Sequence, residues 1–162
     1  MKLIVMGCCA TKRAAGGVMH AIDRYDGPMW RSLRARIAEL PDAAAAVAAG
    51  ELKLMVLSAK LGLIGVDVPI EDYDLRLTDR RATEMLRDPS YDLQMLPHLV
   101  RSAEAVLFAG GALYRDTMWK ASGSTVAQIM KISETDGAGI GVHRAELGAW
   151  LYQHYAPMRL AA

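Results

Sequence analysis

Four short apolar runs, spaced along the chain, constrain the fold more than any other feature. The first three are apolar almost throughout, as strands buried on both faces are, and the fourth alternates enough to be a strand. Segments with helical spacing lie between and after them, and this alternation predicts an α/β fold. We expect a mostly parallel sheet of four strands, or slightly more, flanked by helices. The runs are "KLIVMG" (2–7), "LKLMVLS" (52–58), "AEAVLFAGG" (103–111) and "VAQIMKIS" (126–133).

Amphipathic patterns identify the helices between the runs. The segment 27–41 has an apolar stripe that includes Trp30, and the segment 143–155 has one that includes Trp150. Both tryptophans are therefore expected in the core. Shorter helices are expected at residues 42–50, 79–100 and 112–122, the second of them interrupted at Asp88-Pro89.

The composition is that of an ordinary globular protein. With 162 residues, 52% of them hydrophobic and 23% charged, the chain is predicted to form one domain over residues 1–162. No apolar run reaches 18 residues, so no membrane span is expected. The N-terminal apolar run is too short for a signal peptide and predicts a buried strand. The net charge of +1 argues against a nucleic-acid binder that uses its whole surface, and leaves a local basic patch open.

The two cysteines, Cys8 and Cys9, are adjacent in the sequence. Neighbouring cysteines rarely form a disulfide without strain, so both are expected to be reduced thiols in a cytoplasmic protein. The ten methionines leave room for a homodimer interface, which composition does not locate.

The loops that follow the predicted strands mark where a ligand would bind. In parallel α/β sheets, ligands collect beyond the carboxyl ends of the strands. Four long or glycine-rich segments leave those ends and should open onto one rim. These segments are residues 8–26, residues 58–79, the pair Gly110-Gly111, and residues 134–142, which include Gly139 and Gly141.

The segment "SAKLGLI" directly follows the second strand. A lysine among free backbone N–H groups makes a concavity that binds anions, and Gly62 allows close backbone approach. Phosphate is the expected anion, and the alternative is a solvated Lys60 on a surface turn. The chain lacks G-x-x-x-x-G-K-[ST], and neither "GGALYR" nor "GAGIG" completes a dinucleotide fingerprint. We therefore expect no nucleotide cofactor.

Side chains with reactive chemistry lie near these loops. Lys12 and Arg13 follow the two cysteines, and their charge would lower a thiol pKa and make Cys8 or Cys9 nucleophilic. A small buried hydrophobe is the alternative for either cysteine. Asp74 could act as a base or orient a donor group, or could simply cap a turn. The histidines are scattered, so no metal site is expected.

Five sequence pieces recur together in a known group of proteins. The most specific is S-A-K-x-G-L-I with a downstream Tyr-Asp pair, here Ser58, Ala59, Lys60, Tyr73 and Asp74. The others are weaker alone but stand in the same order: "MGCCATK" with Cys8 and Lys12, "YDGPMWRSLR" with Tyr25 and Gly27, "AGGALYR" with Gly110, Gly111 and Tyr114, and "GAGIGVHRAELGAWL" with Gly139 and Gly141.

In these pieces, which cover nearly the whole chain, the sequence resembles the YaaA-like proteins, and in particular small domains of unknown function from bacteria and phages. Larger YaaA proteins are associated with peroxide-stress resistance and DNA binding. A more distant similarity is to the core of archaeosine synthase, which modifies a deazaguanine base in tRNA. This chain lacks the extra helical portion that larger YaaA proteins use for DNA, and its cysteine is doubled.

The residues and the resemblance together predict an enzyme that acts on a nucleotide or a nucleic-acid base, by transfer or substitution at the base. The partner would be a nucleotide or a nucleic acid, with DNA preferred to RNA, and no cofactor or metal is expected. The alternative is a non-catalytic DNA-binding or stress-response protein. That alternative needs one basic face made of Lys12, Arg13, Arg24, Arg31, Arg34 and Lys60.

The expected catalytic residues are Cys8, Lys60 and Asp74. The expected substrate-binding residues are Cys9, Lys12, Tyr25, Gly27, Ser58, Ala59, Gly62, Tyr73, Gly110, Gly111, Tyr114, Gly139 and Gly141.

Overall fold

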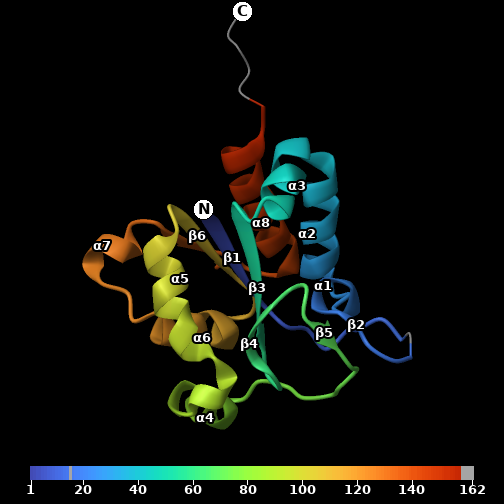
Figure 1. Cartoon of the computed structure of the whole chain (residues 1–162), viewed down its shortest axis with the longest axis vertical. Helices are drawn as coiled ribbons and strands as arrows, with labels where there is room; N and C mark the ends of the chain where they lie inside the picture. The colour runs from blue at the N-terminus through green and yellow to red at the C-terminus, as the bar shows by residue number, and fades with distance from the viewer. Residues whose placement is uncertain (15, 158–162) are drawn as a thin grey trace, which may run out of the picture.

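The first three apolar runs form the parallel strands at the centre of the sheet. β1 (Lys2–Gly7) lies between β3 (Leu52–Ser58) and β6 (Ala105–Ala109), and both neighbours run parallel to it. This computed structural model describes residues 1–14 and 16–157. With β4 (Gly62–Gly65) and β7 (Ile132–Glu134) at the edges, the strand order is β4-β3-β1-β6-β7. The predicted α/β class with a mostly parallel sheet of slightly more than four strands is confirmed (Figure 1).

Helices cover both faces of this sheet, which explains why β1 is apolar on both sides. Figure 1 shows α2 (Pro28–Glu39), α3 (Pro41–Ala48) and α8 (Ile140–Tyr155) on one face, and α5 (Leu96–Ser102) and α6 (Ala112–Ser122) on the other. A strand between two such layers has no solvent-facing side. Residues Leu3 to Met6 of β1 are accordingly no more than 1% exposed. Trp30 of α2 and Trp150 of α8 are also buried, as expected.

The fourth predicted strand is largely wrong. Residues 126–129 form a helical turn, α7 (Val126–Ile129), and only Ile132–Glu134 pairs with β6. Thr125 starts this turn with a capping box, in which Gln128 accepts a hydrogen bond from the Thr125 N–H. Val126 and Met130 are more than 80% exposed, so the alternation in this run does not reflect a buried face.

The first half of the long segment after β3 forms two short strands, and residues 71–78 are irregular. The segment folds back at once as β4, which pairs antiparallel with β3, and then forms β5 (Pro69–Ile70). β5 pairs antiparallel with β2 (Met19–His20), from the loop that follows β1. The N–H of Ala21, the first residue of α1 (Ala21–Arg24), also donates to the Val68 carbonyl. These bonds fasten the two long loops to each other at the carboxyl edge of the sheet.

The helical region after that segment is interrupted where expected. α4 (Asp79–Arg87) ends before Asp88, and the short helical turns η1 (Pro89–Tyr91) and η2 (Leu93–Met95) lead into α5. Asp88 caps the new turn, because its carboxylate accepts a hydrogen bond from the Ser90 N–H. No helix within the described ranges is both long and apolar enough to span a membrane.

The chain connections diverge to opposite faces of the sheet at the carboxyl ends of β1 and β6. The chain leaves β1 toward α2 and α3 on one face, whereas β6 leads into α6 on the other (Figure 1). Connections that diverge to opposite faces leave a gap at the strand ends, where ligands bind in open α/β sheets. The candidate site lies there.

Candidate functional site

A thiol and four hydroxyl groups gather at the carboxyl ends of β1 and β3. The Cys8 Sγ lies 3.0 Å from the Tyr114 Oη. The Tyr73 Oη lies 2.7 Å from the Ser58 Oγ and 2.6 Å from the Tyr25 Oη. Cys8, Tyr25 and Ser58 are buried. We refer to Cys8, Tyr25, Ser58, Tyr73 and Tyr114 as the thiol–tyrosine cluster.

Two glycines let α6 approach β1 closely enough to place Tyr114 beside Cys8. A Cβ on Gly7 would lie 2.8 Å from the Tyr114 ring, and a Cβ on Gly110 would lie 3.2 Å from the Gly7 nitrogen. Gly110 also has a φ of +146°, which side chains rarely adopt. Gly111 has open space around it and an ordinary φ, so its role is to begin α6.

Tyr73 is the residue on which the two loop lysines converge. The Lys12 Nζ lies 4.3 Å and the Lys60 Nζ 5.5 Å from the centre of the Tyr73 ring. Both distances are within the range of a cation–π attraction. The two bonds of the Tyr73 hydroxyl hold the ring still, so the ring gives both flexible lysine side chains a fixed contact.

The three phenols of the cluster are hydrogen-bonding groups rather than bases. Burial raises the pKa of Tyr25 to about 12. Burial, followed by the negative charge of an ionised Cys8, also raises the pKa of Tyr73 and of Tyr114. All three side chains therefore keep their protons at neutral pH.

Cys9 has a structural role that differs from the expected one. Its Sγ donates to the Thr11 carbonyl at 2.9 Å and accepts a hydrogen bond from the Gly27 N–H at 3.3 Å. Burial raises the pKa of the Cys9 thiol, although Lys12 acts weakly in the other direction. The expectation of a lowered pKa is therefore wrong for Cys9. Glycine at position 27 leaves room for this sulfur, because a Cβ there would lie 3.0 Å from the Cys9 Sγ.

The "SAKLGLI" segment is a hairpin turn, and its backbone N–H groups already have partners. The N–H groups of Lys60 and Leu61 donate to the Ser58 Oγ at 3.3 and 3.0 Å. The Ala59 N–H donates to the Cys8 Sγ at 3.4 Å. The prediction that these N–H groups are free to hold an anion is wrong. What the turn offers to a ligand is the exposed Lys60 side chain.

Contacts from α4 and η1 hold this turn in place, and sequence reasoning missed them. Arg81 donates from Nε to the Ala59 carbonyl at 2.9 Å and from Nη2 to the Lys60 carbonyl at 3.2 Å. Gly62 has a φ of +81°, and a Cβ there would lie 2.1 Å from the Tyr91 carbonyl oxygen. The only available signal was an arginine in the first turn of the helix that follows the segment.

Two hollows share Tyr73 as a lining residue. The first has a volume of 380 Å³ and is lined by Ala10, Lys12, Asp72, Tyr73 and Asp74. We call it the polar hollow, and it contains the predicted Asp74, which is exposed. The second has a volume of 340 Å³, is lined mainly by aliphatic side chains, and includes Lys60. We call it the apolar hollow. The sequence showed no sign of either Asp72 or the aliphatic lining, because that stretch was expected to be loop.

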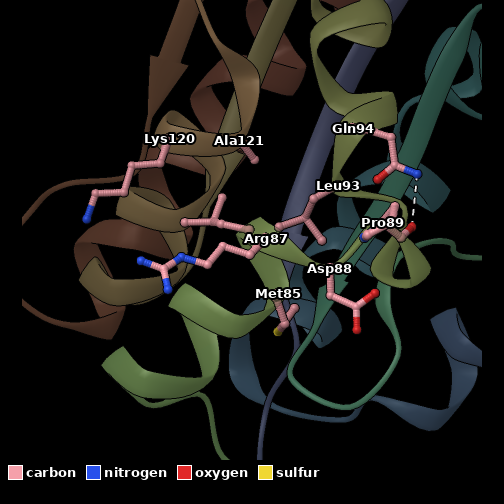
Figure 2. A pocket seen from close by; sticks show the side chains of 9 residues that line it. Met85, Arg87, Asp88, Pro89, Leu93, Gln94, Lys120 and Ala121 are labelled. Carbon is pink, nitrogen blue, oxygen red and sulfur yellow. Dashed lines mark hydrogen bonds between the residues drawn. The ribbon is translucent and has the colours of Figure 1, made fainter.

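A third hollow lies elsewhere and shares no residue with these two. It has a volume of 230 Å³ between α4, the turns that follow α4, and α6. Figure 2 shows Arg87 and Lys120 directed to the same side of it, while Gln94 is bonded to the Pro89 carbonyl. Lys120 pairs with Asp116.

Two of the six residues of the basic face that the DNA-binding alternative needs, Arg24 and Arg34, bond within the protein. Arg24 is fully buried and donates to the carbonyls of Arg13 and Gly17. Arg34 donates to the Ile22 and Tyr25 carbonyls, at 2.7 and 2.8 Å. Arg34 also pairs with Asp26. These two arginines hold loops together instead of facing solvent.

The glycines before the last helix are not part of the cluster. Gly139 precedes α8 and has a φ of +91°, which suits the turn into that helix. Gly141 lies within the first turn of α8 and has open space around it. Both follow β7 at the sheet edge, whereas the cluster forms beside β1 and β3. The prediction that they contribute to the same site is not supported by any contact among the described residues.

A search for metal-binding groups and comparisons with known proteins gave no further information on this site. Within residues 1–14 and 16–157, no group of three or more His, Cys, Asp or Glu side chains is placed to hold a metal ion. No family model, no curated protein and no solved structure matches the chain.

Proposed function

We propose that this protein is an enzyme that acts on a nucleotide or a nucleic-acid base, by transfer or substitution at the base. The observation that carries the proposal is the convergence around Tyr73. Lys12, Asp72 and Asp74 line one ligand-sized hollow beside Tyr73, and Lys60 lines a second hollow that shares Tyr73. Both lysines lie near the Tyr73 ring, and the cluster that includes Tyr73 also contains a buried thiol. Hollows of 340 and 380 Å³ lie at the lower end of the range for small-ligand sites.

Lys12 and Lys60 supply the anion-binding charge. Each ammonium group is a compact cation that suits a phosphate, and each comes from a loop that follows a different parallel strand. The Tyr73 ring, held by its hydroxyl bonds, restrains both groups near the same place. Asp74, in the polar hollow, accepts a hydrogen bond or a proton from the ligand.

Cys8 is the nucleophile in this proposal. Its sulfur accepts a hydrogen bond from the Ala59 N–H and lies 3.0 Å from the Tyr114 hydroxyl, and these two contacts fix its position at the strand ends. The sulfur attacks a base carbon, the carbon–sulfur bond forms as the bond to the leaving group breaks, and the thiol proton departs with that group. A second nucleophile, with its own proton, then displaces the sulfur and restores the thiol.

The resemblance to YaaA-like proteins supports the same reading, and we include membership of that group in the proposal. Residues from four of its separate sequence pieces meet here: Cys8, Tyr25, Tyr73 and Tyr114. Both cysteines are free thiols, which fits the proposed cytoplasmic location. The non-catalytic DNA-binding alternative is the weaker of the two, because Arg24 and Arg34 of its basic face bond within the protein.

Calorimetric titration with nucleoside monophosphates and short DNA and RNA oligonucleotides tests the binding step. We expect Lys12→Ala and Lys60→Ala each to weaken binding by about tenfold. Lys53→Ala, which removes an exposed lysine of β3 outside these hollows, should leave the affinity unchanged. The proposal is wrong if none of these ligands binds. It is also wrong if the variant that combines Lys12→Ala with Lys60→Ala binds the ligands as tightly as the wild type.

Intact-protein mass spectrometry tests the covalent step. A ligand that binds should leave a mass adduct on the wild type and on Cys9→Ser, and none on Cys8→Ser. Binding by Cys8→Ser should stay within about twofold of the wild type, because the lysines hold the ligand. An adduct that persists in Cys8→Ser would show that Cys8 is not the nucleophile.

A further inference from the structure

The two hollows that share Tyr73 differ in chemical character. The polar hollow presents one ammonium group and two carboxylates, from Lys12, Asp72 and Asp74. The apolar hollow presents aliphatic side chains from two elements: Leu61 and Ile64 from the β3–β4 hairpin, and Val68 and Ile70 from the arm that follows. A ligand that spans Tyr73 would therefore be charged at one end and flat or apolar at the other.

From this we infer that the apolar hollow is the base subsite of a nucleotide whose phosphate is held by Lys12 and Lys60. The inference rests on the proposed function and deepens it. Val68 is 37% exposed beside an open hollow of 340 Å³, and covering such aliphatic surface with a base is favourable. Lys60 lines the same hollow and lies near the Tyr73 ring, so a phosphate bound there is adjacent to the base.

Glu71 gives this subsite a preference among bases. Its exposed carboxylate lines the apolar hollow, and a carboxylate can only accept hydrogen bonds. Adenine, cytosine and guanine each carry an exocyclic amino group that donates to such an acceptor. Uracil and thymine place carbonyl oxygens on both sides of their single N–H, and these repel a carboxylate. The subsite therefore takes an amino-bearing base in preference to uracil or thymine.

The test compares AMP, CMP, GMP, UMP and ribose 5-phosphate as calorimetric probes. We expect the amino-bearing nucleotides to bind about tenfold more tightly than UMP, and ribose 5-phosphate to bind more weakly than any of them. Glu71→Gln should reduce the preference for CMP over UMP to about twofold, because an amide can also donate. Glu51→Gln removes an exposed carboxylate before the amino end of β3 and should preserve the preference.

A second pair of variants tests the apolar lining without disturbing the core. Val68→Asp places a carboxylate in the apolar hollow and should weaken CMP binding at least tenfold. Ribose 5-phosphate binding should weaken less, because the sugar phosphate carries no base to contact the aliphatic lining. Val126→Asp changes an exposed valine of α7, outside this hollow, and should have no effect on either ligand.

The outcomes separate this inference from the proposed function. If ribose 5-phosphate binds as tightly as the nucleotides and depends on Lys60, the phosphate site stands and the base subsite is overturned. Equal affinity for CMP and UMP, or full affinity in Val68→Asp, also overturns the subsite. If no probe binds the wild type, both the subsite and the proposed function fail.

Discussion

Cys8 and Cys9 show how far two adjacent residues can differ once the chain has folded. The Cys8 sulfur faces the β3 turn and Tyr114, whereas the Cys9 sulfur bonds to Thr11 and to Gly27 at the start of α2. Successive side chains near the end of a strand point in opposite directions, so neighbouring thiols enter different environments. Their roles therefore differ: Cys8 belongs to the thiol–tyrosine cluster, and Cys9 fixes a loop.

Gly62 gives the sharpest prediction for a single residue. Gly62→Ala should cost about 3–5 kcal/mol in free energy of unfolding, because a φ of +81° is strained and the new Cβ would lie 2.1 Å from the Tyr91 carbonyl oxygen. Gly50→Ala is the matched control, with a φ of +73° and no atom within 4 Å of the new Cβ. Its cost should stay near 1–2 kcal/mol, about that of the left-handed conformation alone. Equal losses in urea denaturation would mean that the Tyr91 contact relaxes freely.

Among the elements, the β3–β4 hairpin depends on α4 for its position. The Ala59 carbonyl belongs to a fully buried residue, and the Arg81 guanidinium donates to it and to the Lys60 carbonyl. Arg81 also stacks on Tyr91, with its guanidinium carbon 4.5 Å from the ring centre. The helix that follows the hairpin by many residues thus returns to hold its turn and, with it, the base of the Lys60 side chain.

Arg81→Ala should destabilise the protein by about 1–3 kcal/mol, because it leaves a buried carbonyl without its donor. The neighbouring Arg80→Ala is the control. Both arginines pair with Glu84, but the Arg80 side chain is 90% exposed and the Arg81 side chain only 21%. Loss of the Arg80 surface pair should change the stability by less than about 0.5 kcal/mol. Amide hydrogen exchange at Lys60 and Leu61 should accelerate only in Arg81→Ala, and equal exchange in both variants would argue against this role.

At the scale of the whole molecule, the tyrosines of the thiol–tyrosine cluster make the free energy of unfolding depend on pH in the alkaline range. Tyr25 follows α1, Tyr73 follows β5 and Tyr114 lies in α6, and burial raises the pKa of each phenol. A phenol whose pKa is higher in the folded state stabilises the fold while it is protonated. That contribution is complete below the unfolded pKa and is lost as the pH rises through the folded one.

The free energy of unfolding should therefore fall as the pH rises above 10. Tyr25, whose pKa rises from 10.0 to about 12, should account for about 2–3 kcal/mol of that loss. Tyr25→Phe should make the fall in unfolding free energy between pH 10 and 12 shallower, by about the slope that the release of one proton produces. Tyr152→Phe, which changes an exposed residue of α8, should leave the slope unchanged. Urea denaturation across this range measures the slope, and an identical slope in Tyr25→Phe would contradict the assignment.

Much of the fold could be predicted because its signals are local. β1, β3 and β6 are buried on both faces, so each had to be a continuous apolar run, and the break at Asp88-Pro89 follows from the geometry of proline. Local signals failed where the same residue pattern fits both a strand and a helical turn. Residues 126–133 alternate like a strand, yet the Thr125 capping box turns their first part into a helix.

In the candidate site, too, some features could be predicted from the sequence and others depend on the tertiary structure. The order of the parallel strands determines which loops meet at the rim, so the sequence alone predicted that Cys8, Lys60 and Tyr73 lie near one another. What each side chain contacts was decided only in three dimensions, because hydrogen-bond partners need not be close in the chain. Tyr114, the partner of Cys8, stands 106 positions away in the sequence, and the Ser58 hydroxyl takes up the N–H groups that had been expected to hold an anion.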